Sequence, residues 1–437
     1  MPTLEPTDVH ATLRRHSMVA GHPLVLDLEK SRGLFLRDAL SDQNFFDFAS
    51  FYASNALGFH HPRLEAADAR ERLFEASLVK VGNPEFYTRE LANFVSALER
   101  IAAPPTHPHY FFIEGGALAV ENAMKTAMDW KVRKNLGRGL GEIGTEILHF
   151  EHAFHGRSGY TLSVTNTDPA KTLHFPKFDW PRIASPAAEF PLSGENLAAT
   201  EQAEARTLAA IERAFDERPQ RVAAILLEPI QGEGGDRHFR AEFLQALRRI
   251  ADQREALLIF DEVQTGVGVT GHFWAHEFAE IRPDIICFAK KLQVGGFFAS
   301  TRIDDVDNVF KVPSRISSTW GGGLVDMVRA TYILEVIAEE KLVENARERG
   351  RELLAGLERL AAEFPDDVRN VRGRGLLCAF DAPSAAQRNE LIKRCFAQRF
   401  LVLAGGPLSI RLRPPLVVTA EEIQLGLKCL RAALIDG

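Results

Sequence analysis

Residues 284–296 read "DIICFAKKLQVGG", an apolar run that ends abruptly in two adjacent lysines and then a pair of glycines. The apolar part is short and rich in β-branched and aromatic side chains, which is typical of a strand buried on both faces. In open α/β sheets, ligands bind beyond the carboxyl ends of the strands. A lysine at such an end indicates a chemical role, and Lys290 and Lys291 are the two candidates.

Four similar runs precede this one, at residues 109–114, 146–151, 222–229 and 256–262. The segments between them show helical periodicity, for example over residues 91–98 and 241–253. Strands that alternate with helices in this way predict a three-layer α/β domain with a mostly parallel sheet. We expect this large domain to occupy residues 65–325.

The end of the chain has a different pattern. Long helical segments begin near residue 325, and the strand candidates "RGRGLLCAF" and "FLVLAGGPLSIRLRPPL" follow them. This order predicts a smaller α+β domain over residues 326–437, completed by an N-terminal segment of residues 1–64.

Composition and charge narrow the class of protein. A formal net charge of −7 over 437 residues argues against nucleic acid or an acidic membrane as the main partner. The four cysteines are scattered, with no C-x-x-C pair, which is typical of a reduced intracellular protein. The N-terminal residues resemble no signal peptide, and no apolar run has membrane-spanning length. We therefore expect a cytoplasmic protein.

Two motifs suggest chemistry that their context does not support. Residues 266–271, "GVGVTG", fit the dinucleotide pattern G-x-G-x-x-G, but "DEVQT" separates them from the preceding strand and "VGVT" is a poor helix start. A glycine-rich loop is the better interpretation. His149, His152 and His155 are three residues apart, but on a strand this spacing sends successive side chains to different faces. We expect no metal site.

Polar residues follow several of the predicted strands, including Glu114, Glu228, Asp261 and Lys290. Solvated loop charge explains such residues singly, whereas their convergence on one sheet edge predicts a site. The strand that ends at Glu114 continues into two glycines and a helix, which is either an ordinary turn or an anion site at a helix N-terminus. Pyridoxal phosphate would use a phosphate site, a lysine for a Schiff base and an acidic residue for its ring nitrogen.

The stretch "LLIFDEVQTGVGVTG", followed by "PDIICFAKKLQVGG", resembles the class III (ω-amino acid) pyridoxal-phosphate aminotransferases. The resemblance covers nearly the whole chain, from "DFASFYASNALGFHHP" to "IRLRPPL". It implies fold-type I: a large α/β/α domain with a mostly parallel sheet and a small α+β domain. Ala289, Val294 and Gly295 fit the family's frame around a reactive Lys290, whereas Lys291 would be a helper or merely a surface lysine.

The resemblance also implies cofactor contacts around the pyridine ring. Asp261 would pair with the ring nitrogen, Gln264 would bond to the phenolic oxygen, and Phe154 would stack on the ring. Glu228 would support Gln264. Lys290, once released from the cofactor, would move the proton between the substrate carbon and the cofactor.

Three further residues would bind phosphate by the same resemblance. Gly116 and Ala117 would donate backbone N–H groups, and Thr319 would reach the phosphate in the neighbouring subunit. This implies a homodimer whose active sites are shared across the interface.

Two arginines and a glutamate would select the substrates. Arg411 matches the arginine that binds the α-carboxylate of 2-oxoglutarate or L-glutamate, and Glu233 matches the residue that masks it while the amino donor binds. A structural Arg–Glu pair is the alternative. Arg157 is placed to hold a carboxylate at the far end of an ω-amine donor.

The donor expected from these residues is L-lysine, because "KKLQVGG", "EPIQGEGGDRHF" and "FASFYASNALG" are most similar to members of the family that act on lysine. Its ε-amino group would move to 2-oxoglutarate, giving L-glutamate and 2-aminoadipate 6-semialdehyde, which cyclises to piperideine-6-carboxylate. The alternatives are an aminotransferase for 4-aminobutyrate or another ω-amino acid and, from another class, an NAD-dependent dehydrogenase. A non-catalytic relative would lack Lys290 or Asp261, and both are present.

Overall fold

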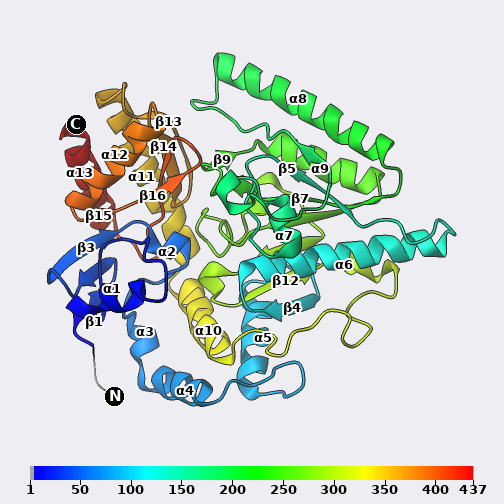
Figure 1. Ribbon diagram of the computed structural model, residues 1–437, viewed down its shortest axis with the longest axis horizontal. Coiled ribbons are helices and arrows are strands. Elements are labelled where there is room, and N and C mark those ends of the chain that lie inside the picture. Colours follow the sequence, from blue (N-terminus) through cyan, green and yellow to red (C-terminus); the bar gives the residue numbers. More distant parts are fainter. Residues whose placement is uncertain (1–3, 437) are drawn as a thin grey trace.

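A seven-stranded sheet lies at the centre of the computed structural model, which describes residues 4–436 (Figure 1). Its strand order is β4-β12-β11-β10-β7-β5-β6, and all pairings are parallel except those of β12 with its two neighbours. The strands are β4 (His109–Ile113), β5 (Glu146–Phe150), β6 (Arg182–Ile183), β7 (Val222–Leu227), β10 (Leu257–Asp261), β11 (Ile285–Phe288) and β12 (Gly295–Ala299). All five predicted apolar runs are strands of this sheet, so the α/β fold class is confirmed.

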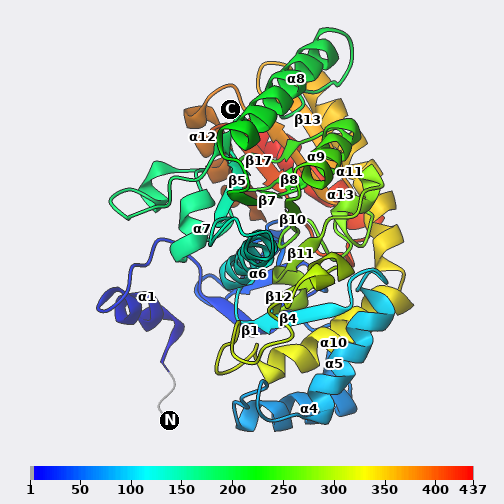
Figure 2. The same cartoon turned by 90° about the vertical axis from the view of Figure 1, so that its right-hand side faces the viewer.

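The strands are apolar on both faces because helices cover both sides of the sheet. Ala224 and Ile259 pack with the side of α6 (Gly116–Gly137), whereas Ile225 and Phe260 pack with α9 (Ala241–Gln253). Figure 2 looks almost along α6, with α9 and α8 (Gly194–Glu217) on the other side of β7 and β10. The helices that flank this region are α3 (Pro62–Glu65), α4 (Ala67–Leu78), α5 (Arg89–Ile101) and α7 (Gly159–Val164), with the short hairpin β8 (Ile230–Gln231) and β9 (Arg237–His238).

Strands β6 and β12 were not among the predicted strands, and β12 begins with two glycines. The structure shows why glycine stands there. A Cβ on Gly295 would lie 2.5 Å from the carbonyl oxygen of Gly115, and one on Gly296 would lie 2.2 Å from that of Phe111. The glycines therefore allow β12 to pair closely with β4 on one side and β11 on the other.

Two smaller sheets join the ends of the chain. The antiparallel order β13-β14-β17-β16 uses only C-terminal residues, whereas the order β1-β2-β3-β15 pairs three N-terminal strands with one C-terminal strand. This pairing supports our proposal that residues 1–64 and 326–437 form one small domain, of which residues 1–3 and 437 lie outside the described part. The elements are α1 (Pro6–Arg14), β1 (Leu26–Arg32), β2 (Phe35–Asp38), β3 (Gln43–Asp47), α10 (Leu324–Glu339), α11 (Leu342–Glu363), β13 (Arg369–Arg374), β14 (Leu377–Asp381), α12 (Ala385–Ala397), β15 (Phe400–Leu401), β16 (Leu403–Gly405), β17 (Ser409–Leu412) and α13 (Ala420–Ile435).

A left-handed turn follows strand β3. Four successive residues of α2 (Ser50–Ala53) have positive φ angles between 40° and 65°. Such a run is costly for residues other than glycine, so contacts must hold it. Asp47 accepts two backbone N–H groups at 2.8 Å, and the Ser50 hydroxyl donates to the carbonyl of Arg413 at 2.5 Å. The turn places Ser54 at the wall of the cavity described below.

The loop "GVGVTG" packs against helix α11 of the small domain. A Cβ on Gly268 would lie 3.3 Å from a methyl group of Val343, and one on Gly271 would lie 3.0 Å from the Cβ of Arg347. The glycines thus allow the loop to approach α11 closely. No helix begins at these glycines, which agrees with the glycine-rich loop predicted for residues 266–271. Within residues 4–436, no helix has both the length and the apolar character needed to cross a bilayer.

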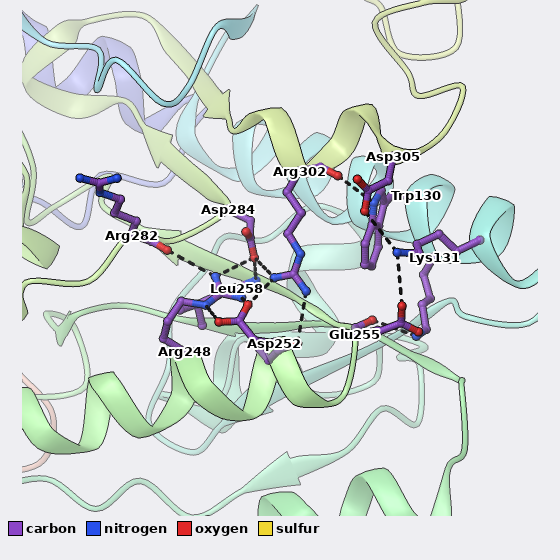
Figure 3. A network of polar contacts seen from close by, with 12 residues as sticks. Trp130, Lys131, Arg248, Asp252, Glu255, Leu258, Arg282, Asp284, Arg302 and Asp305 are labelled. Atoms are coloured by element: carbon purple, nitrogen blue, oxygen red, sulfur yellow. Dashed lines mark hydrogen bonds and ion pairs between the residues drawn. The ribbon is translucent and has the colours of Figure 1, made fainter.

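A buried carboxylate joins the amino ends of the central strands to α9 (Figure 3). Asp284, just before β11, accepts the backbone N–H of Leu258 at 2.7 Å and pairs with Arg248 at 2.8 Å and Arg302 at 3.1 Å. Its side chain is 8% exposed, so water screens these contacts little. This network lies at the edge of the sheet opposite to Asp261 and Lys290, and its role is therefore structural.

Replacing Asp284 with asparagine should lower the free energy of unfolding by about 3 kcal/mol, because two arginines lose their shared buried partner. The shift of the urea midpoint measures this. Asp305→Asn is the matched control, since Asp305 pairs with Lys134 at 3.2 Å but is 50% exposed and should cost less than about 1 kcal/mol. Equal shifts for the two variants would contradict the structural role of Asp284.

Candidate active site

A cavity of about 530 Å³ opens at the carboxyl ends of β10 and β11, beside the start of α6. The predicted residues that line it are Gly116, Ala117, Phe154, Arg157, Glu228, Glu233, Asp261, Gln264 and Lys290. Arg411 and Thr319 do not line it. The structure therefore brings most of the predicted site residues together from five separate segments of the chain.

Lys290 is the second residue after β11 and begins a single 3-10 turn, Lys290–Leu292. Its φ angle is 42°, a left-handed value that costs a residue with a side chain about 1–2 kcal/mol. Burial lowers the pKa of its amine, so the neutral form that can act as a nucleophile or base becomes more accessible. Strain and burial at one strand-end lysine are typical of a functional residue.

Lys291 has a different environment. Its side chain is buried, with 3% of the residue exposed, and its amine donates to the carbonyl oxygen of Gln264 at 2.9 Å. Burial lowers the pKa of this amine well below its ordinary value. The interpretation of Lys291 as a surface lysine was wrong, because its side chain turns inward and ties the loop after β10 to the loop after β11.

Asp261 lies at the end of β10, opposite Cys287 of β11 in parallel register. One carboxylate oxygen accepts the backbone N–H of Val263 at 3.1 Å, and the other lies 2.8 Å from Nδ1 of the fully buried His155. Nε2 of His155 has no hydrogen-bond partner among the described residues. Sequence reasoning considered His155 only as a metal ligand and missed this contact, for which its place directly after Phe154 was the available signal.

The start of α6 forms an anion cradle. Gly115 precedes the helix with a φ angle of 86°, and a Cβ on Gly116 would lie 2.9 Å from a methyl group of Val263. A side chain at this position would collide with Val263, so glycine allows the first turn of α6 to lie close against the cavity wall. The N–H groups of the first turn and the helix dipole favour a phosphate there. A cradle for phosphate, a lysine at a strand end and a buried carboxylate together fit pyridoxal phosphate.

Glu228 lines the cavity and holds two loops beside it through backbone hydrogen bonds. Its carboxylate accepts the backbone N–H groups of Phe154 and Gly232, both at 3.0 Å, and burial raises its pKa to about 7. No hydrogen bond joins it to Gln264 in the described residues, and its predicted support of Gln264 stays a prediction. Its effect on Gln264 passes through Gly232, where a Cβ would lie 2.1 Å from the side-chain oxygen of Gln264.

The predicted pair of Glu233 and Arg411 is not formed in this structure. Arg411 is 2% exposed and bonds to the carbonyl oxygen of Ala404 at 2.7 and 3.0 Å and to Gln264 at 3.3 Å. Glu233 pairs with Lys171. Sequence reasoning missed Lys171, because nothing in the sequence near residue 171 indicates that its loop reaches the cavity.

Arg157 and Thr319 complete the predicted set. Arg157 is exposed at the wall of the cavity, with no hydrogen bond or ion pair to any residue between 4 and 436. Thr319 is exposed outside the cavity, where its carbonyl oxygen lies near Gly82. A threonine in this position does not contribute to the cavity of its own chain.

Comparisons with known proteins agree with this site. The model of the "Aminotransferase class-III" family matches residues 17–434. The L-lysine-epsilon aminotransferase of Mycobacterium tuberculosis is 50% identical over 434 residues, which cover 98% of this chain and 96% of that protein. The mitochondrial 4-aminobutyrate aminotransferase of Homo sapiens is 34% identical over 432 residues, covering 93% and 84%.

Among solved structures, lysine aminotransferase from M. tuberculosis matches with a TM-score of 0.97 and 48% identity, over 99% of this chain and all of that one. The sequence comparison and the structure comparison thus identify the same kind of protein over nearly the full length of this chain. The chain belongs to the class III aminotransferases.

Proposed function

We propose that this protein transfers the ε-amino group of L-lysine to 2-oxoglutarate, giving L-glutamate and 2-aminoadipate 6-semialdehyde. The observation that carries the proposal is the arrangement of two arginines at different depths, with Arg157 exposed at the cavity wall and Arg411 buried behind Gln264. A long donor with one distal carboxylate needs the first arginine, and a dicarboxylate acceptor can use both. The similarity to an L-lysine-epsilon aminotransferase and to a solved lysine aminotransferase supports L-lysine as the donor.

Class III aminotransferases use pyridoxal phosphate, which supplies an electron sink when bound. Lys290 would hold the cofactor covalently and, once displaced by the substrate amine, act as the base that moves a proton. Asp261 would keep a proton on the ring nitrogen, with His155 holding its carboxylate at 2.8 Å. The N–H groups of Gly116 and Ala117 would bind the phosphate, and Phe154 would cover one face of the ring.

Substrate choice would depend on the arginines. The α-carboxylate of lysine would bind to Arg157, which leaves the distal amine to face Lys290. In the second half-reaction, 2-oxoglutarate would place one carboxylate on each arginine. Glu233 would pair with Arg411 while the amino donor is bound, because an unmasked arginine favours α-amino acids that present a carboxylate beside the reacting carbon.

The proposal includes a homodimer in the cytoplasm. Thr319 is exposed away from the cavity of its own chain, as expected of a residue that contributes to the phosphate site of a second copy. The neighbouring segments also expose large aromatic side chains, among them Phe86 at 66%, Tyr87 at 84% and Trp320 at 37%. A second copy would cover this apolar surface.

The donor is tested by kcat/KM for lysine, ornithine and 4-aminobutyrate at fixed 2-oxoglutarate. Lysine should be the best donor, because a cavity sized for it holds the shorter 4-aminobutyrate out of reach of Arg157. Arg157→Ala should lower kcat/KM for lysine by about 50-fold, as expected for a lost charge-assisted contact, and Arg157→Lys should restore part of it. A higher kcat/KM for 4-aminobutyrate would reject lysine and leave only the family.

A further inference from the structure

We propose that Lys171 is the alternative partner of Glu233, so that Glu233 moves between Lys171 and Arg411 and thereby sets how often Arg411 is free for a carboxylate. This inference rests on the proposed use of Arg411 for the α-carboxylate of 2-oxoglutarate or glutamate. Lys171 is a positioning residue here: it acts on the substrate only through Glu233.

The first observation is the environment of Lys171. It ends the 3-10 turn Pro169–Lys171, and its amine pairs with Glu233, bonds to the hydroxyl of Thr167 at 3.2 Å and lies 5.3 Å from the ring centre of Phe154. Its side chain is 16% exposed. The carboxylate of Glu233, the hydroxyl of Thr167 and the ring of Phe154 therefore hold the amine at the cavity. The ion pair with Glu233 is thus a contact of a partly buried lysine.

The second observation is the state of Arg411. Its guanidinium contacts only neutral oxygens among the described residues, those of Ala404 and Gln264, and burial lowers its pKa to about 10. A buried arginine without an acid partner attracts any carboxylate that reaches it. While Glu233 pairs with Lys171, Arg411 thus has no acid partner, and this is the arrangement that the dicarboxylate half-reaction needs.

The third observation is that cations surround a single movable acid. Burial lowers the pKa of Lys171, the charge of Asp168 raises it, and the charges of Arg157 and Arg411 lower it. Asp168 does not line the cavity, and its carboxylate accepts the backbone N–H of Ala170 at 2.9 Å. Glu233 is the one carboxylate among the cavity-lining residues near this cationic group that is not held by backbone N–H groups, because Glu228 and Asp261 both accept such bonds. Removing one of its cations must therefore shift Glu233 toward another.

The variant Lys171→Met keeps the length and apolar contacts of the side chain but removes its charge. Glu233 should then mask Arg411 more often, and KM for glutamate and for 2-oxoglutarate should rise about fivefold with kcat little changed. The lysine half-reaction should not be weakened. The dissociation constant of glutarate, which carries two carboxylates and cannot react, should rise by the same factor when measured by calorimetry on the holoenzyme.

Three variants isolate the cause. Lys171→Arg should restore the wild-type values, because it restores the charge. Lys177→Met is the matched control, since Lys177 lies on the same loop and, within residues 4–436, its amine bonds only to the carbonyl oxygens of Thr172 and Phe175. In a Glu233→Gln background, Lys171→Met should change neither KM nor glutarate binding. Glu233→Ala alone should raise activity with glutamate relative to the ω-amine donor.

Several outcomes would overturn the inference. An equal loss in both half-reactions would make Lys171 a structural residue of its loop, and an effect that persists in Glu233→Gln would show that it does not act through Glu233. Unchanged glutamate kinetics would mean that Glu233 does not use this partner. The glutamate half-reaction and glutarate binding do not involve lysine, so they report on Lys171 even if the donor panel rejects lysine.

Discussion

Replacing Lys290 with alanine is expected to lower transamination by at least about 10⁴-fold, because the variant loses both the amine that holds the cofactor and the base that moves the proton. The fold should remain, since Lys290 makes no side-chain hydrogen bond among residues 4–436 and its left-handed turn is stabilised from the backbone, where Gln293 donates to its carbonyl at 2.8 Å. Single-turnover absorbance with lysine and with glutamate measures the loss.

Borohydride reduction followed by peptide mass mapping tests the assignment directly. The pyridoxyl group should be found on Lys290, which lines the cavity, and not on Lys291, whose amine lies 2.9 Å from the carbonyl oxygen of Gln264. Lys291→Met is the matched control in the adjacent position. It should keep turnover within about tenfold and lose about 1 kcal/mol of stability with its hydrogen bond. A label on Lys291 would refute the assignment.

The sequence predicted five of the seven strands of the central sheet, because each of the five is a short apolar run typical of a strand buried on both faces. It also predicted that Asp261 and Lys290 lie side by side, since both follow neighbouring strands. Strand β12 was missed because its glycines serve close backbone packing, which leaves no periodic signal. Local patterns therefore specified which residues reach the site but not every element that supports it.

Contacts between distant segments were the hardest to predict. His155 meets Asp261 across 106 residues, and Lys171 meets Glu233 across 62. Neither pair follows from periodicity, because side chains on loops choose partners only after the sheet has placed those loops. The predicted contact between Glu233 and Arg411 stays a prediction for the donor-bound state. The role of Thr319 likewise stays a prediction, because it involves a second copy of the chain.

The second large effect is expected at Asp261. Asp261→Asn should lower kcat by about 10³-fold with both lysine and glutamate, because a neutral amide cannot keep a proton on the ring nitrogen as a carboxylate does. The substitution changes volume little. The amide can keep both contacts only if its oxygen accepts the N–H of Val263 and its NH₂ group donates to Nδ1 of His155, which must then carry its proton on Nε2.

The control for this loss is His155→Gln, which leaves the charge of Asp261 in place and removes only its buried partner. If the charge is what matters, this variant should lose about tenfold in kcat, far less than Asp261→Asn, because the N–H of Val263 still orients the carboxylate. Cofactor content, measured after alkaline release, must be equal in the two variants for the comparison to hold. Near-normal turnover of Asp261→Asn with full cofactor would refute the proposed role of Asp261. Equal losses of kcat in Asp261→Asn and His155→Gln would mean that the two residues together provide the position of the carboxylate and not its charge.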